Sequence, residues 1–247
     1  MPADTTPLRR QPESECGTFP QAPRLGNVQD LPSPAQVPRR PALMTIRFHR
    51  DDLPDLSRYQ VSAAIDTEAL GLNPHRDRLC LVQLSPGDGT ADIIQIEKDR
   101  RPAPNLLRLL ADQRVLKIFH FARFDIGLLF ASFGVMATPL YCTKIASRLT
   151  RTYTDRHGLK DLARELLDLD MSKQQQSSDW GAPILSEAQL AYAASDVLHL
   201  HAIKERLDLR LAREGRGELA EACFRFLPTR ARLDLMGWNE EDIFAHV

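Results

Sequence analysis

Residues 61–68 read VSAAIDTE, an apolar run that ends in two carboxylates. Small and β-branched residues in such a run predict a buried strand. Because side chains alternate across a strand, Asp66 and Glu68 point to the same side at its carboxyl end. Neighbouring carboxylates repel one another unless a cation neutralises them, and Mg²⁺ prefers oxygen ligands. The D-x-E pattern alone leaves open a pair of solvated residues at a strand end.

The segments that follow this strand alternate between strand and helix patterns. Strands are expected at 78–84 and 91–96, and with the first strand and the turn at 86–89 they form a three-stranded meander. A helix at about 105–112, a strand at 115–119, a helix at about 122–133 and a short strand at 139–142 come next. Together they predict the α/β class, with a mixed β-sheet flanked by α-helices.

The remainder of the chain has helical patterns. Thr143 is expected to cap a helix, and residues 159–167 have apolar positions at helical spacing. Residues 186–189 (SEAQ) form a capping-box pattern. This pattern predicts one long helix that passes Tyr192 and Asp196 and ends near Arg213.

Two further motifs carry acidic residues. HFARFD at 120–125 follows an apolar strand and places Asp125 one turn into a helix, where the helix dipole favours an acid without any catalytic role. YAASD places Tyr192 and Asp196 four residues apart, on one face of a helix. Each motif is common by itself, but the three in this order on these elements indicate one site with four carboxylates and a phenol.

These motifs resemble those of ribonuclease D and, more widely, of the proofreading-type DEDD exonucleases with tyrosine in the third motif. The resemblance covers about residues 52–206 and includes LKDL at 159–162 and KQQQSSDW at 173–180. It implies a ribonuclease-H-like fold and 3'→5' exonuclease activity. Longer ribonucleases D carry C-terminal helical domains, whereas about fifty residues follow Asp196 here, so the resemblance is to a short form.

The resemblance also implies catalysis by two divalent ions, Mg²⁺ or Mn²⁺. Asp66, Glu68 and Asp196 would hold one ion, and Asp66 would bridge to a second ion that Asp125 supports. Tyr192 would orient the attacking water, since a phenol with a pKa of about 10 stays protonated at pH 7. The expected reaction is hydrolysis of RNA from its 3' end with release of nucleoside 5'-monophosphates, in RNA processing or turnover.

The expected partner is the 3' end of single-stranded RNA or DNA. Lys173 and Trp180 are candidates for contacts with a phosphate and a terminal base, although a solvated lysine and a core tryptophan fit the sequence equally. His120 is expected to support the nucleic-acid site rather than to bind metal. A DNA exonuclease has the same motifs. An RNA-binding module without activity is the remaining alternative, but such modules usually lose an acid, and all four are present.

The composition is that of an ordinary globular protein, with 43% hydrophobic and 26% charged residues and a net charge of -1. A near-neutral charge predicts local rather than broad contacts with nucleic acid. No stretch approaches the roughly 18 consecutive apolar residues of a membrane helix, and the N-terminus lacks the apolar core of a secretory signal. The four cysteines form no C-x-x-C pair, so reduced thiols in the cytoplasm are expected.

Residues 1–43 differ in composition from the rest of the chain. They contain nine of the seventeen prolines and few aromatic residues, which predicts a disordered extension. The exonuclease domain with a C-terminal helical extension is therefore expected at 44–247, and Met44 is a candidate for the natural start.

Overall fold

The computed structural model describes residues 45–98, 102–172, 174–175 and 177–246. The expected disordered extension at 1–43 and the domain boundary at Met44 lie outside the described residues.

A six-stranded mixed sheet forms the centre of the fold, with strand order β1-β4-β3-β2-β5-β6. Strands β2, β3 and β4 form the expected antiparallel meander, whereas β1, β5 and β6 each pair in parallel. The strands are β1 Thr45–Arg50, β2 Ser62–Ala69, β3 Leu79–Ser85, β4 Thr90–Gln95, β5 Leu116–Phe119 and β6 Leu140–Cys142. The predicted mixed sheet is confirmed.

The middle strands are buried because helices cover the sheet. Ala63, Ala64 and Ile65 of β2 are fully buried, and every residue of β3 is buried. A strand covered on both faces is apolar along its whole length instead of alternating with polar residues. The acidic end of β2 is therefore held on a rigid, closely packed strand.

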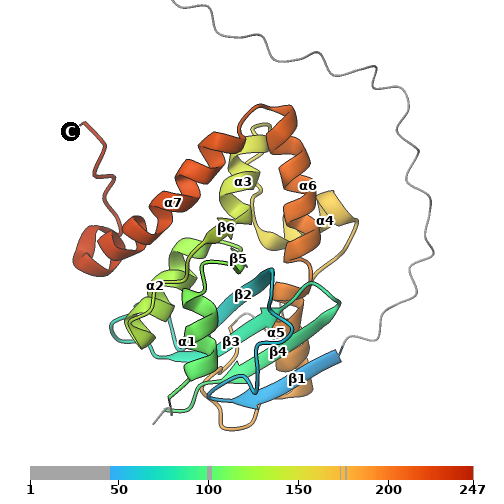
Figure 1. The fold of residues 1–247 in the computed structure, drawn as a ribbon, viewed down its shortest axis with the longest axis vertical. Helices are drawn as coiled ribbons and strands as arrows, with labels where there is room; N and C mark the ends of the chain where they lie inside the picture. The colour runs from blue at the N-terminus through green and yellow to red at the C-terminus, as the bar shows by residue number, and fades with distance from the viewer. Residues whose placement is uncertain (1–44, 99–101, 173, 176, 247) are drawn as a thin grey trace, which may run out of the picture. The chain divides into compact units, whose positions relative to one another are not determined.

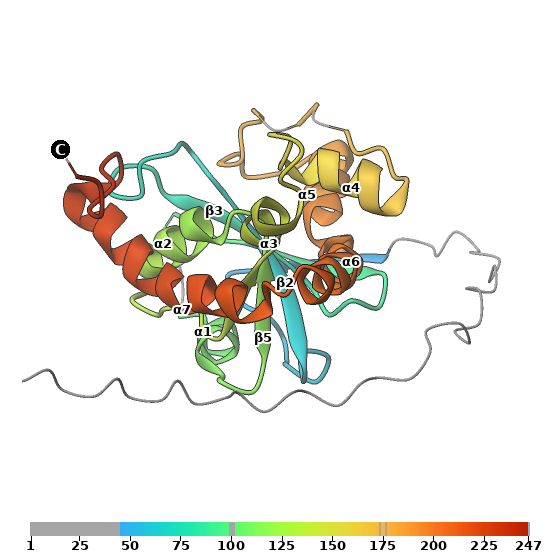
Figure 2. The ribbon, with the colours of Figure 1, turned by 90° about the horizontal axis from the view of Figure 1, so that it is seen from above.

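Seven α-helices and a π-helical turn, η1, surround the sheet within the described part of the chain. They are α1 Pro104–Ala111, α2 Ala122–Phe133, α3 Thr143–Thr150, α4 Leu159–Leu167, α5 Glu187–Leu198, α6 Leu200–Arg213, α7 Gly217–Leu233 and η1 Asp234–Trp238. Helix α5 packs against β1, β2, β3 and β4, and α2 packs against β2, β3 and β5. Figure 1 shows α6 and α7 beyond the β6 edge of the sheet, and Figure 2 shows α7 running beside α2.

Three details differ from the sequence-based expectation. Strand β1 was not expected; it pairs with β4, and that partner lies far along the chain. The predicted long helix is interrupted at His199, whose amide donates to Val197 O instead of to the carbonyl four residues back. Thr143 does not cap α3: its hydroxyl donates to Phe119 O at 3.2 Å, and the N-cap residue is Cys142.

No helix in the described part of the chain combines the length and the apolar character needed to cross a membrane. Among the described cysteines, Cys80, Cys142 and Cys223 are all free thiols.

Candidate active site

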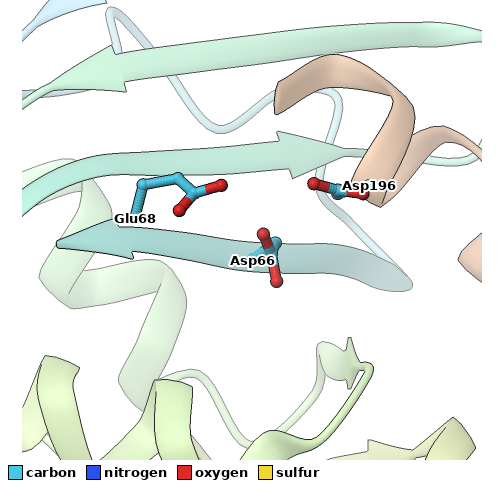
Figure 3. Close-up of side chains that lie close together, drawn as sticks. All are labelled: Asp66, Glu68 and Asp196. Atoms are coloured by element: carbon cyan, nitrogen blue, oxygen red, sulfur yellow. The ribbon is translucent and has the colours of Figure 1, made fainter. Parts of the chain in front are cut away.

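Three carboxylates converge at the acidic end of β2. Asp66 and Glu68 share one side of this strand, and Asp196 faces them from α5, as Figure 3 shows. One carboxylate oxygen from each lies within 4.8 Å of the others. Because α5 crosses β2 and β3, residues more than a hundred positions apart in the sequence meet here. The three oxygens are close enough together to ligate a single ion.

Asp125, in the first turn of α2, is the fourth carboxylate. It lines one cavity together with Asp66, Glu68 and Asp196, and we call it the catalytic cavity because of the chemistry proposed below. The Asp125 side chain is buried, and its Oδ1 accepts a hydrogen bond from Thr67 Oγ1 at 2.6 Å. Thr67 therefore positions Asp125 beside Asp66 and Glu68. This role of Thr67 was not predicted from the sequence, although Thr67 is the middle residue of the D-T-E motif.

Burial and mutual repulsion disfavour the ionised forms of these carboxylates. Burial raises the pKa of Asp66 to about 7, and burial together with the Asp66 charge raises the pKa of Asp196 to about 8. The pKa of Glu68 is raised to about 9 by burial and by repulsion from Asp66, Asp196 and Asp125. A cation would reverse these shifts by favouring the ionised forms. An all-oxygen donor set of this kind fits Mg²⁺ or Mn²⁺.

Tyr192 lies one helical turn before Asp196 on α5 and lines the catalytic cavity with it. Burial and the nearby Asp196 and Glu68 charges raise the pKa of the Tyr192 phenol above its ordinary value. The phenol is therefore protonated at neutral pH and acts as a neutral hydrogen-bond donor. As expected from their spacing, Tyr192 and Asp196 lie on one face of a helix, α5.

Trp180, one of the two candidate nucleic-acid contacts at 173–180, does not line this cavity. Trp180 is 3% exposed, and its ring centroid lies 6.0 Å from that of Tyr192. Of the two roles left open for Trp180, this burial favours the core side chain, which supports the ring of Tyr192. Lys173 lies outside the described residues.

His120 lines the cavity at the end of β5, where its Nδ1 pairs with Thr143 Oγ1 at 2.9 Å. Burial, with a smaller contribution from the Lys144 charge, lowers the pKa of His120 to about 3. The imidazole is therefore neutral at physiological pH and does not compensate the carboxylate charge. Its hydrogen bond to Thr143 links β5 to the start of α3.

The lining of the catalytic cavity also includes side chains that the sequence analysis missed. The cavity has a volume of about 310 Å³ and contains Lys144, Lys160, Phe121 and Phe124 in addition to the acidic residues. Lys144 Nζ lies 4.1 Å from the centroid of the Phe121 ring. Two ammonium groups and two aromatic rings beside a carboxylate cluster suit a phosphate and a base. The sequence does not reveal these four side chains as a group, because they come from three separate regions of the chain, at α2, α3 and α4.

Comparisons with known proteins agree with this geometry. A family model described as 3'-5' exonuclease matches residues 53–212. Ribonuclease D of Gluconacetobacter diazotrophicus is 35% identical over 176 residues, which cover 71% of this chain and 44% of that protein. This chain thus spans less than half of the length of that relative.

Solved structures extend the likeness to the fold. Brucella melitensis NrnC with bound Mg²⁺ has a TM-score of 0.80 and 66% identity, covering 83% of this chain and 100% of that chain. Another structure, 67% identical, is Brucella melitensis NrnC bound to pGG. Escherichia coli RNase D, an exoribonuclease involved in structured RNA processing, has a TM-score of 0.64 and 25% identity, covering 71% of this chain and 46% of that chain. The predicted ribonuclease-H-like fold is confirmed, and by its matching domain and its acidic centre the chain belongs to the 3'-5' exonuclease family.

Proposed function

We propose that this protein is a metal-dependent 3'→5' exoribonuclease that acts in RNA processing or turnover. It would hydrolyse phosphodiester bonds at the 3' end of single-stranded RNA and release nucleoside 5'-monophosphates. The observation that carries the proposal is the convergence of Asp66, Glu68 and Asp196 within 4.8 Å, with Tyr192 one turn from Asp196. The likeness to ribonuclease D and NrnC supports RNA as the substrate.

The carboxylates would hold two Mg²⁺ or Mn²⁺ ions. Asp66, Glu68 and Asp196 would ligate one, and Asp66 would share the second with support from Asp125. Bound divalent ions supply positive charge for the attacking water and for the leaving 3'-oxygen. The raised pKa values of Asp66, Glu68 and Asp196 support this role, because burial and, for Glu68 and Asp196, neighbouring carboxylates disfavour the ionised forms that bound cations would favour.

The remaining side chains would hold the substrate in place. The protonated Tyr192 hydroxyl would hydrogen-bond to the attacking water and orient it. Lys144 and Lys160 would neutralise phosphates, and Phe121 would stack on a base. His120 would act through Thr143, by fixing the start of α3 from which Lys144 projects.

The length of the natural substrate is suggested by the neighbour. Because NrnC has been solved bound to pGG, we include very short RNAs, down to dinucleotides, among the proposed substrates. The volume of the catalytic cavity, about 310 Å³, is compatible with such small ligands.

The test is hydrolysis of matched single-stranded RNA and DNA of one sequence, with Mg²⁺, with Mn²⁺ and with chelator. We expect metal-dependent release of 5'-monophosphates from the 3' end of RNA, and a slower rate on DNA. Faster cleavage of DNA would replace the proposal with a DNA exonuclease. Binding without cleavage of either polymer would indicate a module without catalytic activity.

A further inference from the structure

Gln83, in the middle strand of the meander, is a fully buried glutamine whose amide has no partner among the described residues. Its side chain is 0% exposed, and neither Nε2 nor Oε1 forms a hydrogen bond there. Burying an amide without a hydrogen bond costs free energy, and buried polar groups in folded proteins are therefore almost always paired. The amide of Gln83 needs a partner, and its neighbours show which groups are within reach.

The register of the sheet places Gln83 beside the metal-binding carboxylates of the proposed function. Asp66 of β2 and Gln83 of β3 are directly opposite each other in the antiparallel ladder. Side chains of such a pair lie on the same face of the sheet, with Cβ atoms about 4.5–5.5 Å apart. Glu68 pairs with the next residue but one along β3, Leu81, and is therefore the diagonal neighbour of Gln83. Asp66 is the nearest polar side chain that β2 offers to the amide.

The other surroundings of Gln83 are largely apolar. On β4 it pairs with Ile93. Because Asp196 of α5 faces Asp66, as Figure 3 shows, α5 covers the face of β3 that carries Gln83. The buried residues of α5 are all apolar: Ala193, Ala194 and Val197.

Gln95 of β4 is the polar exception on this face. It pairs with Leu81 and is therefore the diagonal neighbour of Gln83 on the side away from Asp66. Its Nε2 donates to Ala182 O at 2.8 Å, while its Oε1 is buried without a partner in the described part of the chain. Gln95 is therefore the group that competes with Asp66 for the amide of Gln83.

We propose that Gln83 is a positioning residue for the metal centre, which donates from Nε2 to the Asp66 carboxylate, directly or through one bound water. In this structure the two side chains are not hydrogen-bonded, so the bond forms by rotation of the Gln83 amide. A hydrogen bond to a carboxylate is charge-assisted and fixes the orientation of the acceptor. Orientation matters most for Asp66, because the proposed function, on which this role rests, shares Asp66 between two ions. Gln83 does not line the catalytic cavity, so it acts through Asp66.

The test is the affinity for Mn²⁺ in the absence of RNA, measured by isothermal titration calorimetry on the full-length protein. Gln83→Met removes the amide and keeps an unbranched side chain of similar length. Gln95→Met is the matched control, because it makes the same change in a buried glutamine of the neighbouring strand that is not opposite a proposed ligand. The control removes a hydrogen bond that the structure shows, so a general loosening of the sheet should affect it at least as strongly.

We expect Gln83→Met to weaken Mn²⁺ binding by about tenfold or more, the range for residues that orient metal ligands. Gln95→Met should bind Mn²⁺ as the wild type does, although its melting temperature should fall because it loses a buried hydrogen bond. Wild-type affinity in Gln83→Met, or equal losses of affinity in the two variants, would overturn the role of the Gln83 amide.

A crystal structure of the wild-type protein with Mn²⁺ bound tests the contact without any substitution, and it decides the question if Gln83→Met does not fold. We expect Nε2 of Gln83 within hydrogen-bond distance of an Asp66 oxygen, or of one water bound to that oxygen. An amide that pairs with Oε1 of Gln95 instead would overturn the proposal.

Hydrolysis assays separate this inference from the proposed function. Mn²⁺ binding that depends on Gln83, in a protein that cleaves neither RNA nor DNA, would reject the exonuclease and retain the positioning role. Metal-dependent hydrolysis of RNA, with Mn²⁺ affinity unchanged in Gln83→Met, would reject the positioning role and retain the exonuclease. Where both are right, excess Mn²⁺ should restore most of the hydrolysis rate of Gln83→Met, because every proposed ligand is still present.

Discussion

Asp66, Glu68 and Asp196 are the residues proposed to carry the chemistry, because these three half-buried carboxylates lie close together and repel one another. At the scale of single residues, the cavity separates two tasks. In the proposed function the carboxylates would hold cations, and Tyr192, which stays protonated, would donate a hydrogen bond. The first three predictions separate these tasks from each other and from folding.

Asp66→Ala should abolish hydrolysis while leaving the protein folded, because Asp66 is the carboxylate proposed to be shared by both ions. Steady-state hydrolysis of a short RNA measures the loss, and thermal melting checks the fold. Glu97→Ala, which removes a carboxylate from an exposed ion pair, is the control and should behave as the wild type. Retention of more than about a tenth of the activity, which is within 1.4 kcal/mol of the wild-type barrier, would contradict the two-ion assignment.

Tyr192→Phe should slow the chemical step by roughly 10² to 10³, the range for one lost catalytic hydrogen bond, and excess metal should not restore it. Asp196→Asn should differ, because it weakens a charged ligand and higher Mg²⁺ should recover part of the rate. Single-turnover cleavage across a Mg²⁺ titration distinguishes the two variants. Rescue of Tyr192→Phe by metal would show that its hydroxyl does not act on the water.

The metal-free protein should lose stability as the pH rises. The carboxyls of Asp66 and Asp196 have folded-state pKa values of about 7 and about 8, well above the unfolded value of about 4. The folded state therefore binds more protons, so the destabilisation is absent below about pH 4, grows with pH and is complete above the folded-state values. Bound Mg²⁺ should reverse this loss of stability, because it favours the ionised carboxylates.

Melting temperatures at pH 5 and pH 8.5 in chelator, for the wild type and Asp66→Asn, measure this effect. Each kcal/mol of destabilisation corresponds to about 2–4 °C in melting temperature for a domain of this size. Between pH 5 and pH 8.5, the melting temperature of the wild type should fall by more than that of Asp66→Asn. Parallel profiles would show that the carboxylates do not oppose folding.

At the scale of helices and strands, the sequence predicted local elements well and long-range ones poorly. The bounds expected for α2 and α4 match the structure, because apolar spacing and end signals are local. Strand β1 was missed, since its ladder with β4 depends on a partner far along the chain. The break between α5 and α6 at His199 was also missed, because no proline or glycine marks it.

Arg151 and Glu165 illustrate how the helices near the site are fixed. The Arg151 guanidinium is buried and donates to Ser147 Oγ at 3.0 Å, to Arg156 O at 2.6 Å and to Glu165. Glu165 of α4 also accepts from Arg210 of α6 at 3.1 Å. This network joins α3, α4 and α6, and α3 and α4 carry Lys144 and Lys160.

Glu165→Ala should destabilise the protein by about 3 kcal/mol, because it leaves the buried Arg151 charge without its counter-ion. Chemical denaturation with urea measures the change in the free energy of unfolding. The control is Glu221→Ala, which removes an exposed pair with Arg225 and should cost less than about 1 kcal/mol. Equal costs for the two substitutions would mean that the Arg151 network does not hold α3, α4 and α6 together.

At the scale of the whole molecule, the acidic site could be predicted from sequence and its substrate-binding surroundings could not. Asp66, Asp125 and Asp196 lie in motifs with local spacing, and the structure brings them into one cavity. Lys144 and Phe121 reach the cavity only through the packing of α2 and α3 around β5. The packing of α7 beside α2 also brings distant segments together, and no local pattern encodes it.

The metal centre is tested most directly by anomalous diffraction from crystals of the full-length protein soaked in Mn²⁺. We expect one anomalous peak among the carboxylates of Asp66, Glu68 and Asp196, and a second between Asp66 and Asp125. Crystals of Asp66→Ala should lose both peaks. Mn²⁺-dependent hydrolysis in solution with no peak at these carboxylates would contradict the assignment of this cluster as the catalytic metal centre.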